Sequence, residues 1–251
     1  GEISIGYRSS QPPISFVSKS GTPKGYSVDI CQHIVTEMET TIGSPLKVVY
    51  TPVTADNRFE ALSSGKIDIL CGSTTVTLAR REKVDFTQLT FVTGGSYMAL
   101  KGNKVKNNFD GKKIGVVKGS TTAVALTKLF EDVGTQVDFV LLDSADEGIT
   151  ALEENKIDIF SADQVVLVGL AVTSANPDAF QILPDMFSYE PFALAVRRND
   201  ADFRLEADRA ISKLYRSGEI ETVYERWFGT FSGEMSLAMK AMIKFNTISE
   251  E

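Results

Sequence analysis

The sequence has very little histidine and cysteine: one histidine, His33, and two cysteines, Cys31 and Cys71. No Cys-x-x-Cys pair occurs, so the usual ligand set of a zinc site is missing. Cys71 has only one histidine that could serve as its base, and no Gly-x-Ser-x-Gly turn is present. We therefore expect no metal site and no nucleophilic hydrolysis, and over the whole sequence we favour a protein with neither a cofactor nor enzymatic activity.

Long apolar runs and an excess of basic residues are also missing. No run approaches the roughly 20 apolar residues that cross a bilayer. The net charge of −7 includes no basic stripe, which disfavours nucleic acid and anionic membranes as partners. The chain begins on a strand-like run at residues 2–7, so we expect any export segment to be absent from it, either removed or never present.

The two cysteines admit two interpretations. In an oxidising compartment Cys31 and Cys71 can form a disulfide that closes a loop of about 40 residues. Their apolar neighbours suit two buried free thiols equally well. The sequence leaves both interpretations open.

Two short sequence segments each occur twice in the chain. Residues 61–69 (ALSSGKIDI) return as residues 151–159 (ALEENKIDI), and Gly-Ser-Thr-Thr occurs at 72–75 and at 119–122. The longer repeat predicts a helix end, a polar turn and a buried strand in each copy. With 251 residues available, we expect two lobes built on one α/β plan.

The expected strands alternate with helices, which predicts mostly parallel sheets that bind ligands beyond the carboxyl ends of their strands. We expect strands at residues 2–7, 46–51, 67–72, 113–118, 137–142, 157–161 and 193–197. We expect helices at residues 28–38, with Ser27 as N-cap, and at 58–64, 122–133, 145–154, 164–175, 202–228 and 234–245.

Two extended segments, near residues 94–95 and 188–190, are predicted to cross between the lobes. Lobe 1 would then comprise residues 1–93 and 190–251, and lobe 2 residues 96–188. The last helices are expected to pack on lobe 1, with core residues Met235, Met239 and Met242.

The segment 119–122 lies between a predicted strand and a predicted helix. Free backbone N–H groups and the helix dipole attract an anion at such a point. The segment lacks the lysine and glycine spacing of a P-loop, so a carboxylate is the favoured anion. In the alternative interpretation, Ser120 or Thr121 only caps the helix.

Several charged residues stand where a ligand is expected. Arg80 follows the segment 72–75, and arginine can hold a carboxylate through two parallel hydrogen bonds. Arg8 directly follows the first strand, and Arg58 begins a helix, where a cation is unfavourable unless an anion is near. Asp163 follows a lobe 2 strand and suits either an ammonium group or the cap of the next helix. An arginine taken singly is more often a solvated surface residue than a ligand contact.

Three segments make the sequence recognisable: residues 25–30 (GYSVDI), 65–68 (GKID) and 77–87 (TLARREKVDFT). They resemble the type II periplasmic amino-acid-binding proteins of ABC transporters, over nearly the whole chain. Asn57-Arg58 and residues 71–75 are similar to the glutamate/aspartate-binding branch. The resemblance implies a two-lobed fold whose hinge crossings let the lobes close on a ligand. It also implies an exported, periplasmic or extracellular monomer that delivers its ligand to a membrane permease.

The resemblance further implies that seven residues contact one bound amino acid. These are Arg80 on its α-carboxylate, Thr75 and Thr122 as further donors, Ser73 on its α-amino and carboxylate groups, Asp163 on its α-ammonium, and Arg8 and Arg58 on its side-chain carboxylate. The branch carries a histidine where this chain has Ala145, which leaves glutamate versus aspartate open.

The charge of these residues favours an acidic ligand. Three arginines against Asp163 leave a net charge of +2, and an unpaired buried charge costs several kcal/mol. Glutamate or aspartate brings −1, whereas glutamine is neutral and arginine brings +1. Two other functions stay open: the ligand-binding module of a receptor, and a cyclohexadienyl dehydratase-like enzyme on the same fold.

Overall fold

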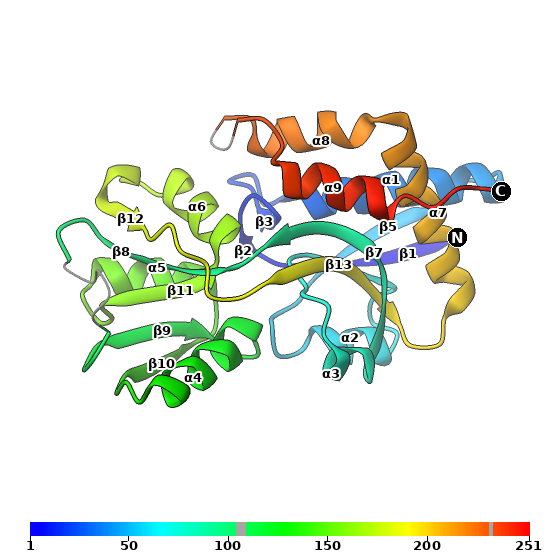
Figure 1. Cartoon of the computed structure of the whole chain (residues 1–251). Coiled ribbons are helices and arrows are strands. Elements are labelled where there is room, and N and C mark those ends of the chain that lie inside the picture. The colour runs from blue at the N-terminus through cyan, green and yellow to red at the C-terminus, as the bar shows by residue number, and fades with distance from the viewer. Residues whose placement is uncertain (104–108, 231–232) are drawn as a thin grey trace. The chain divides into compact units, whose positions relative to one another are not determined.

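The structure, a computed structural model, describes residues 1–103, 109–230 and 233–251. Its contacts divide the chain into two compact units. Unit 1 comprises Gly1–Val53, Asn57–Val92 and Pro191–Glu251, and unit 2 comprises Thr54–Asp56 and Thr93–Glu190. Each unit is built around a sheet with helices on both faces, which confirms the predicted α/β class (Figure 1).

The sheet of unit 1 has, in spatial order, the strands β5 (Lys47–Pro52), β1 (Glu2–Tyr7), β6 (Ile69–Cys71), β13 (Glu190–Arg197) and β7 (Val84–Thr93). β5, β1 and β6 are parallel, whereas β13 is antiparallel to β6. The sheet is therefore mixed, not mostly parallel as the sequence predicts. Tyr7 lies opposite both Pro52 and Cys71, so the three parallel strands end at the same edge.

Helices of unit 1 lie on the two faces of this sheet (Figure 1). One face carries α1 (Tyr26–Ile42), α7 (Ala201–Ser217), α8 (Glu219–Phe228) and α9 (Leu237–Asn246), and the other carries α2 (Arg58–Ser63) and α3 (Leu78–Arg81). A small sheet of β2 (Ser10–Gln11), β3 (Ser15–Val17) and β4 (Pro23–Lys24) precedes α1.

The start of α1 differs from the prediction. Gly25, with a φ of 135°, occupies the N-cap position, and a Cβ there would collide with the carbonyl of Ile14. Ser27 is therefore inside the helix, and the prediction that it caps α1 is wrong. Its hydroxyl instead donates a 3.2 Å hydrogen bond to the carbonyl of Gly72.

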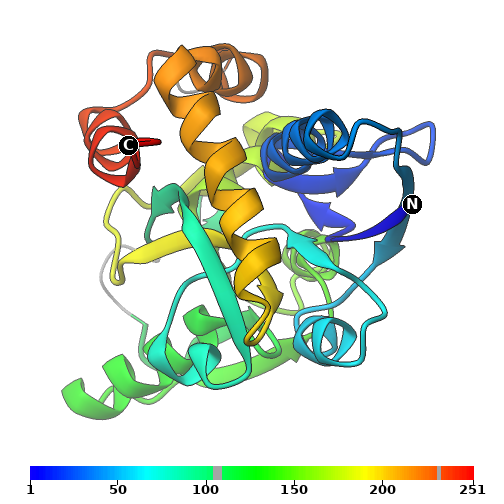
Figure 2. The ribbon, with the colours of Figure 1, turned by 90° about the vertical axis from the view of Figure 1, so that its right-hand side faces the viewer.

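The C-terminal helices belong to unit 1, and the stretch predicted to be helical at 202–228 consists of the two helices α7 and α8. Gly218, with a left-handed φ of 78°, ends α7 and precedes α8. The helix predicted at 234–245 is α9, which packs beside α7 (Figure 2). The three methionines Met235, Met239 and Met242 are buried, as predicted.

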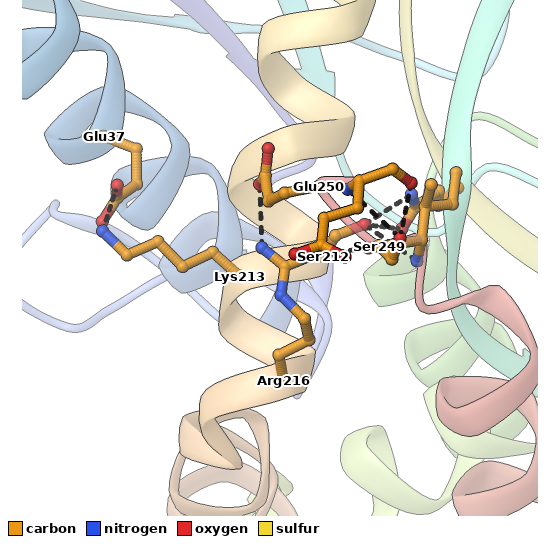
Figure 3. Close-up of polar contacts among 9 residues, drawn as sticks. Glu37, Ser212, Lys213, Arg216, Ser249 and Glu250 are labelled. Carbon is orange, nitrogen blue, oxygen red and sulfur yellow. Dashed lines mark hydrogen bonds and ion pairs between the residues drawn. The ribbon is translucent and has the colours of Figure 1, made fainter.

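Side chains of α7 tie it to the flanking segments (Figure 3). Lys213 pairs with Glu37 of α1 at 2.6 Å, and Arg216 pairs with Glu250 at 2.8 Å. The hydroxyl of Ser212 accepts a bond from the backbone N–H of Ile248. The contacts of Ser212 and Arg216 fix the last residues of the chain along α7, and that of Lys213 joins α7 to α1.

The sheet of unit 2 has the spatial order β10 (Asp138–Leu142), β9 (Lys113–Val117), β11 (Ile159–Asp163), β8 (Gly95–Leu100) and β12 (Phe180–Ile182). β10, β9 and β11 are parallel, and β8 and β12 are antiparallel additions. One face carries α5 (Ala145–Glu153) and α6 (Gln164–Thr173), with a 3₁₀ turn at Pro177–Ala179 before β12, and the other face carries α4 (Thr121–Val133).

Glycine is required where β8 begins. A Cβ on Gly94 would collide with the carbonyl of Ser188, and a Cβ on Gly95 would lie 2.5 Å from the ring of Phe187. The two glycines thus let residues 186–188 pack directly on the start of β8. Within the part of the chain that the structure describes, no helix is both long and apolar enough to span a membrane.

Candidate functional site

Unit 1 carries five of the seven candidate residues, and all five follow strands that end at one edge of its sheet. Arg8 is the residue after β1, and Ser73 and Thr75 follow β6. Arg58 begins α2, which follows β5, and Arg80 lies in α3. Because β5, β1 and β6 are parallel and end in register, this is the edge at which α/β sheets bind ligands.

Arg8 packs against the segment after β6. Its side chain is 6% exposed, and a Cβ at position 72 would lie only 3.0 Å from Cγ of Arg8. Gly72 therefore lets the backbone approach the arginine closely. The backbone N–H of Arg8 donates a 2.9 Å bond to the hydroxyl of Ser15, which fixes the turn after β1. On the same segment, Ser73 donates a 2.8 Å bond to Oε1 of Gln11.

The segment 72–75 is held on both sides. Cys71, immediately before it, forms a disulfide with Cys31 of α1, which decides between the two interpretations left open by the sequence. On the other side, the N–H of Ala193 in β13 donates to the carbonyl of Thr74, and the N–H of Val76 donates to the carbonyl of Pro191. Such support keeps a binding segment in one conformation before a ligand arrives.

Arg58 and Arg80 meet at one aromatic ring. Arg58 is 2% exposed, and its guanidinium carbon lies 4.7 Å from the centroid of Phe59. The guanidinium carbon of Arg80 lies 5.6 Å from the same centroid. Arg80 also donates a 2.9 Å bond to the carbonyl of Thr75. The structure thus brings together two arginines that the sequence only suggests as neighbours of one ligand.

Unit 2 carries Thr122 and Asp163, again after parallel strands. Ser120 is the N-cap of α4 and accepts a 3.2 Å bond from the N–H of Ala123, so the capping interpretation is confirmed for Ser120. Thr122, in the first turn of α4, is buried. Asp163 occupies the N-cap position of α6, but its side chain forms no capping bond within the described residues.

Glu190 is a polar residue near these positions that sequence reasoning missed. It is 2% exposed, and its two carboxylate oxygens accept 2.7 Å bonds from the hydroxyls of Thr121 and Ser188. The hydroxyl of Ser188 in turn accepts a 3.0 Å bond from the N–H of Gly95. Glu190 therefore connects the first residue of α4 with the start of β8. The only signal in the sequence is a glutamate at the edge of an apolar strand.

Comparison with known proteins identifies relatives over nearly the whole chain. The model of the bacterial extracellular solute-binding proteins, family 3, matches residues 3–230. The glutamate/aspartate import solute-binding protein of Salmonella typhimurium is 29% identical, over 97% of this chain and 84% of that protein. The L-glutamate/L-aspartate-binding protein of Pseudomonas aeruginosa is 30% identical, over 91% of this chain and 77% of that protein.

Among solved structures, an ancestral arginine-binding protein bound to arginine superposes with a TM-score of 0.82. Its sequence is 28% identical to this one, and the superposition covers 91% of this chain and 99% of the chain of the ancestral protein. The proteins similar to this chain are thus named for amino acids whose side chains carry opposite charges.

Proposed function

The chain belongs to family 3 of the bacterial extracellular solute-binding proteins, and from that premise we propose that it captures an amino acid outside the cytoplasm and delivers it to an ABC-type permease. The observation that carries the proposal is the chemistry at the strand ends. Unit 1 presents guanidinium groups suited to carboxylates, and unit 2 presents the carboxylate of Asp163, suited to an ammonium. A zwitterion requires both.

The proposed roles follow the chemistry of each group. Arg80, anchored on the carbonyl of Thr75, holds the α-carboxylate, with Thr75, Thr122 and Ser73 as further donors. Asp163 pairs with the α-ammonium. The lobe boundaries and hinge crossings predicted from the sequence remain part of this proposal, as does a monomeric state.

The proposed ligand is an acidic amino acid, glutamate or aspartate. Arg8 and Arg58 are both buried, and neither is needed for the α-carboxylate if Arg80 holds it. Three guanidinium groups in unit 1 and two carboxylates in unit 2, those of Asp163 and Glu190, together sum to a net charge of +1. A ligand of charge −1 neutralises that charge, and residual buried charge is costly. The names of two sequence relatives support the same ligand class.

A binding role is proposed in preference to enzymatic activity because the sequence relatives described above are named as binding proteins. A dehydratase on the same fold would need a carboxylic acid that donates a proton to its substrate. Asp163 is proposed instead as an ionised partner of the ammonium.

A thermal-shift screen of the twenty amino acids tests the proposal. A ligand present at 100 times its Kd adds about 2.7 kcal/mol to the free energy of unfolding. We expect glutamate and aspartate to raise the melting temperature most. A larger shift with glutamine or arginine would overturn the acidic assignment alone, and no shift with any amino acid would overturn the receptor assignment.

A further inference from the structure

The ring of Phe59 makes cation–π contacts with two guanidinium groups. The guanidinium carbons of Arg58 and Arg80 lie 4.7 Å and 5.6 Å from its centroid. A cation within about 6 Å of an aromatic centroid is attracted by the negative charge of the ring face. Both contacts meet this criterion, so one side chain stabilises two guanidinium groups.

This arrangement brings like charges close together. From the two centroid distances, the guanidinium carbons are at most about 10 Å apart. Like charges at such a separation repel, most strongly where water is excluded, as around Arg58. The ring offsets part of that repulsion but leaves the formal charge of each guanidinium unchanged. The carbonyl of Thr75, which accepts a bond from Arg80, is also uncharged.

Phe59 is itself held in place by the core of unit 1. It is the second residue of α2, is partly buried, and packs on a cluster that includes Val53, Leu62, Leu70 and Phe86. Arg58 precedes it in the chain, whereas Arg80 comes from α3. The ring therefore links two helices through their arginines and cannot shift without disturbing the core.

We propose that Phe59 is the positioning residue that sets the spacing of the two guanidinium groups and so selects ligands with two carboxylates. The inference rests on the proposed function, in which Arg80 holds the α-carboxylate and Arg58 the side-chain carboxylate. Phe59 supports both groups at once. Loss of the ring would weaken the binding of glutamate at both of its carboxylates. It would weaken the binding of glutamine at the α-carboxylate only.

Calorimetric titration of Phe59→Leu with glutamate and glutamine tests the proposal. Leucine keeps an apolar side chain on the core but has no ring face. We expect the Kd for glutamate to rise roughly 5- to 30-fold, the equivalent of one or two cation–π contacts. The Kd for glutamine should rise less, so that the preference for glutamate falls. Phe59→Tyr, which keeps the ring, should bind both ligands as the wild type does.

Two controls separate this role from a packing role. Phe86→Leu changes a phenylalanine of the same core cluster and should leave the glutamate-to-glutamine ratio unchanged. Phenylalanine analogues with increasing numbers of ring fluorines, incorporated at position 59, keep the shape of the ring and weaken its negative face. The glutamate Kd should rise stepwise with fluorination, a readout that packing alone would not give.

The failures of the inference and of the proposed function are distinguishable. If the wild type binds glutamate or aspartate but Phe59→Leu and the fluorinated proteins bind them equally well, the role of Phe59 is overturned and the receptor proposal stands. If the wild type binds no acidic amino acid, the acidic assignment and this inference fail together.

Discussion

The carboxylate of Glu190 accepts a 2.7 Å hydrogen bond from the hydroxyl of Thr121, the first residue of α4. The two residues are 69 positions apart. A negative charge at a helix N-terminus is stabilised by the helix dipole, typically by about 0.3–1 kcal/mol. Because the other oxygen of Glu190 binds Ser188, the carboxylate fixes both α4 and the segment that packs on the start of β8.

Glu190→Ala should destabilise unit 2. The substitution removes two hydrogen bonds to a charged group and leaves the hydroxyls of Thr121 and Ser188 without this acceptor. We expect the free energy of unfolding to fall by about 3 kcal/mol, and by about 1 kcal/mol for Glu190→Gln, whose amide still bonds to a hydroxyl. Urea denaturation measures both. Glu131→Ala, an exposed change on the same helix, is the control, and an equal effect there would contradict the assignment.

The arginine variants separate general from specific binding. Removal of one partner of a buried, hydrogen-bonded charge pair costs about 2–5 kcal/mol, or roughly 30-fold to several thousand-fold in Kd. Arg80→Ala should lower the affinity for glutamate, aspartate and glutamine alike. Arg8→Ala and Arg58→Ala should lower the affinity for glutamate and leave the affinity for glutamine unchanged.

Calorimetric titration of the three ligands reads out these effects, and Arg81→Ala, an exposed neighbour of Arg80 on α3, is the control. An unchanged glutamate-to-glutamine ratio in both Arg8→Ala and Arg58→Ala would refute the acidic-ligand proposal. The broader amino-acid-binding proposal would survive that result.

Asp163→Asn should reduce affinity for every amino acid by a similar factor, because all of them carry the α-ammonium. Asparagine is a good N-cap, so the substitution should change the free energy of unfolding by less than about 0.5 kcal/mol. Calorimetric titration of the variant measures its affinity, and urea denaturation measures its free energy of unfolding. Intact affinity would show that Asp163 has no role in the binding of the ammonium group.

Reduction of the disulfide should destabilise the protein. Cys31 and Cys71 are 40 positions apart, and a loop of that length corresponds to about 4 kcal/mol in the chain-entropy model. Cys31→Ser/Cys71→Ser should therefore unfold at lower urea concentration than the oxidised wild type. Reductant should lower the stability of the wild type but not of the double variant. Equal stability of all forms would show that the cross-link contributes nothing.

Elements with clear periodicity follow from the sequence almost to the residue. A helix is predicted at 122–133 and found at Thr121–Val133, and a strand is predicted at 113–118 and found at Lys113–Val117. The break at Gly218 was also readable, since glycine after a helical run is a common helix end. The strands β7 and β8, on either side of the predicted crossing near residues 94–95, were not predicted, because their places in the sheets depend on pairing with distant strands.

The candidate site divides in the same way. Arg8, Ser73 and Thr75 follow strands directly, so strand order alone places them at one edge. The part played by Phe59 was hidden, since an aromatic residue on a short amphipathic helix is predicted as core, and Phe59 does pack on the core. Glu190 was hidden because its partner Thr121 is distant in the sequence. Chemistry carried by single local motifs is predictable, whereas chemistry shared across the fold is not.

The disulfide also has a consequence for refolding of the oxidised chain. β13 lies between β6 and β7 in the sheet of unit 1 and ends at Arg197, more than a hundred residues after Cys71. Until this distant strand arrives, one edge of β6 has no neighbouring strand. An intact bond between Cys31 and Cys71 keeps α1 close to the end of β6 during that time. The oxidised chain therefore begins its search for β13 with one long loop already closed, which lowers the entropy that the search must cost.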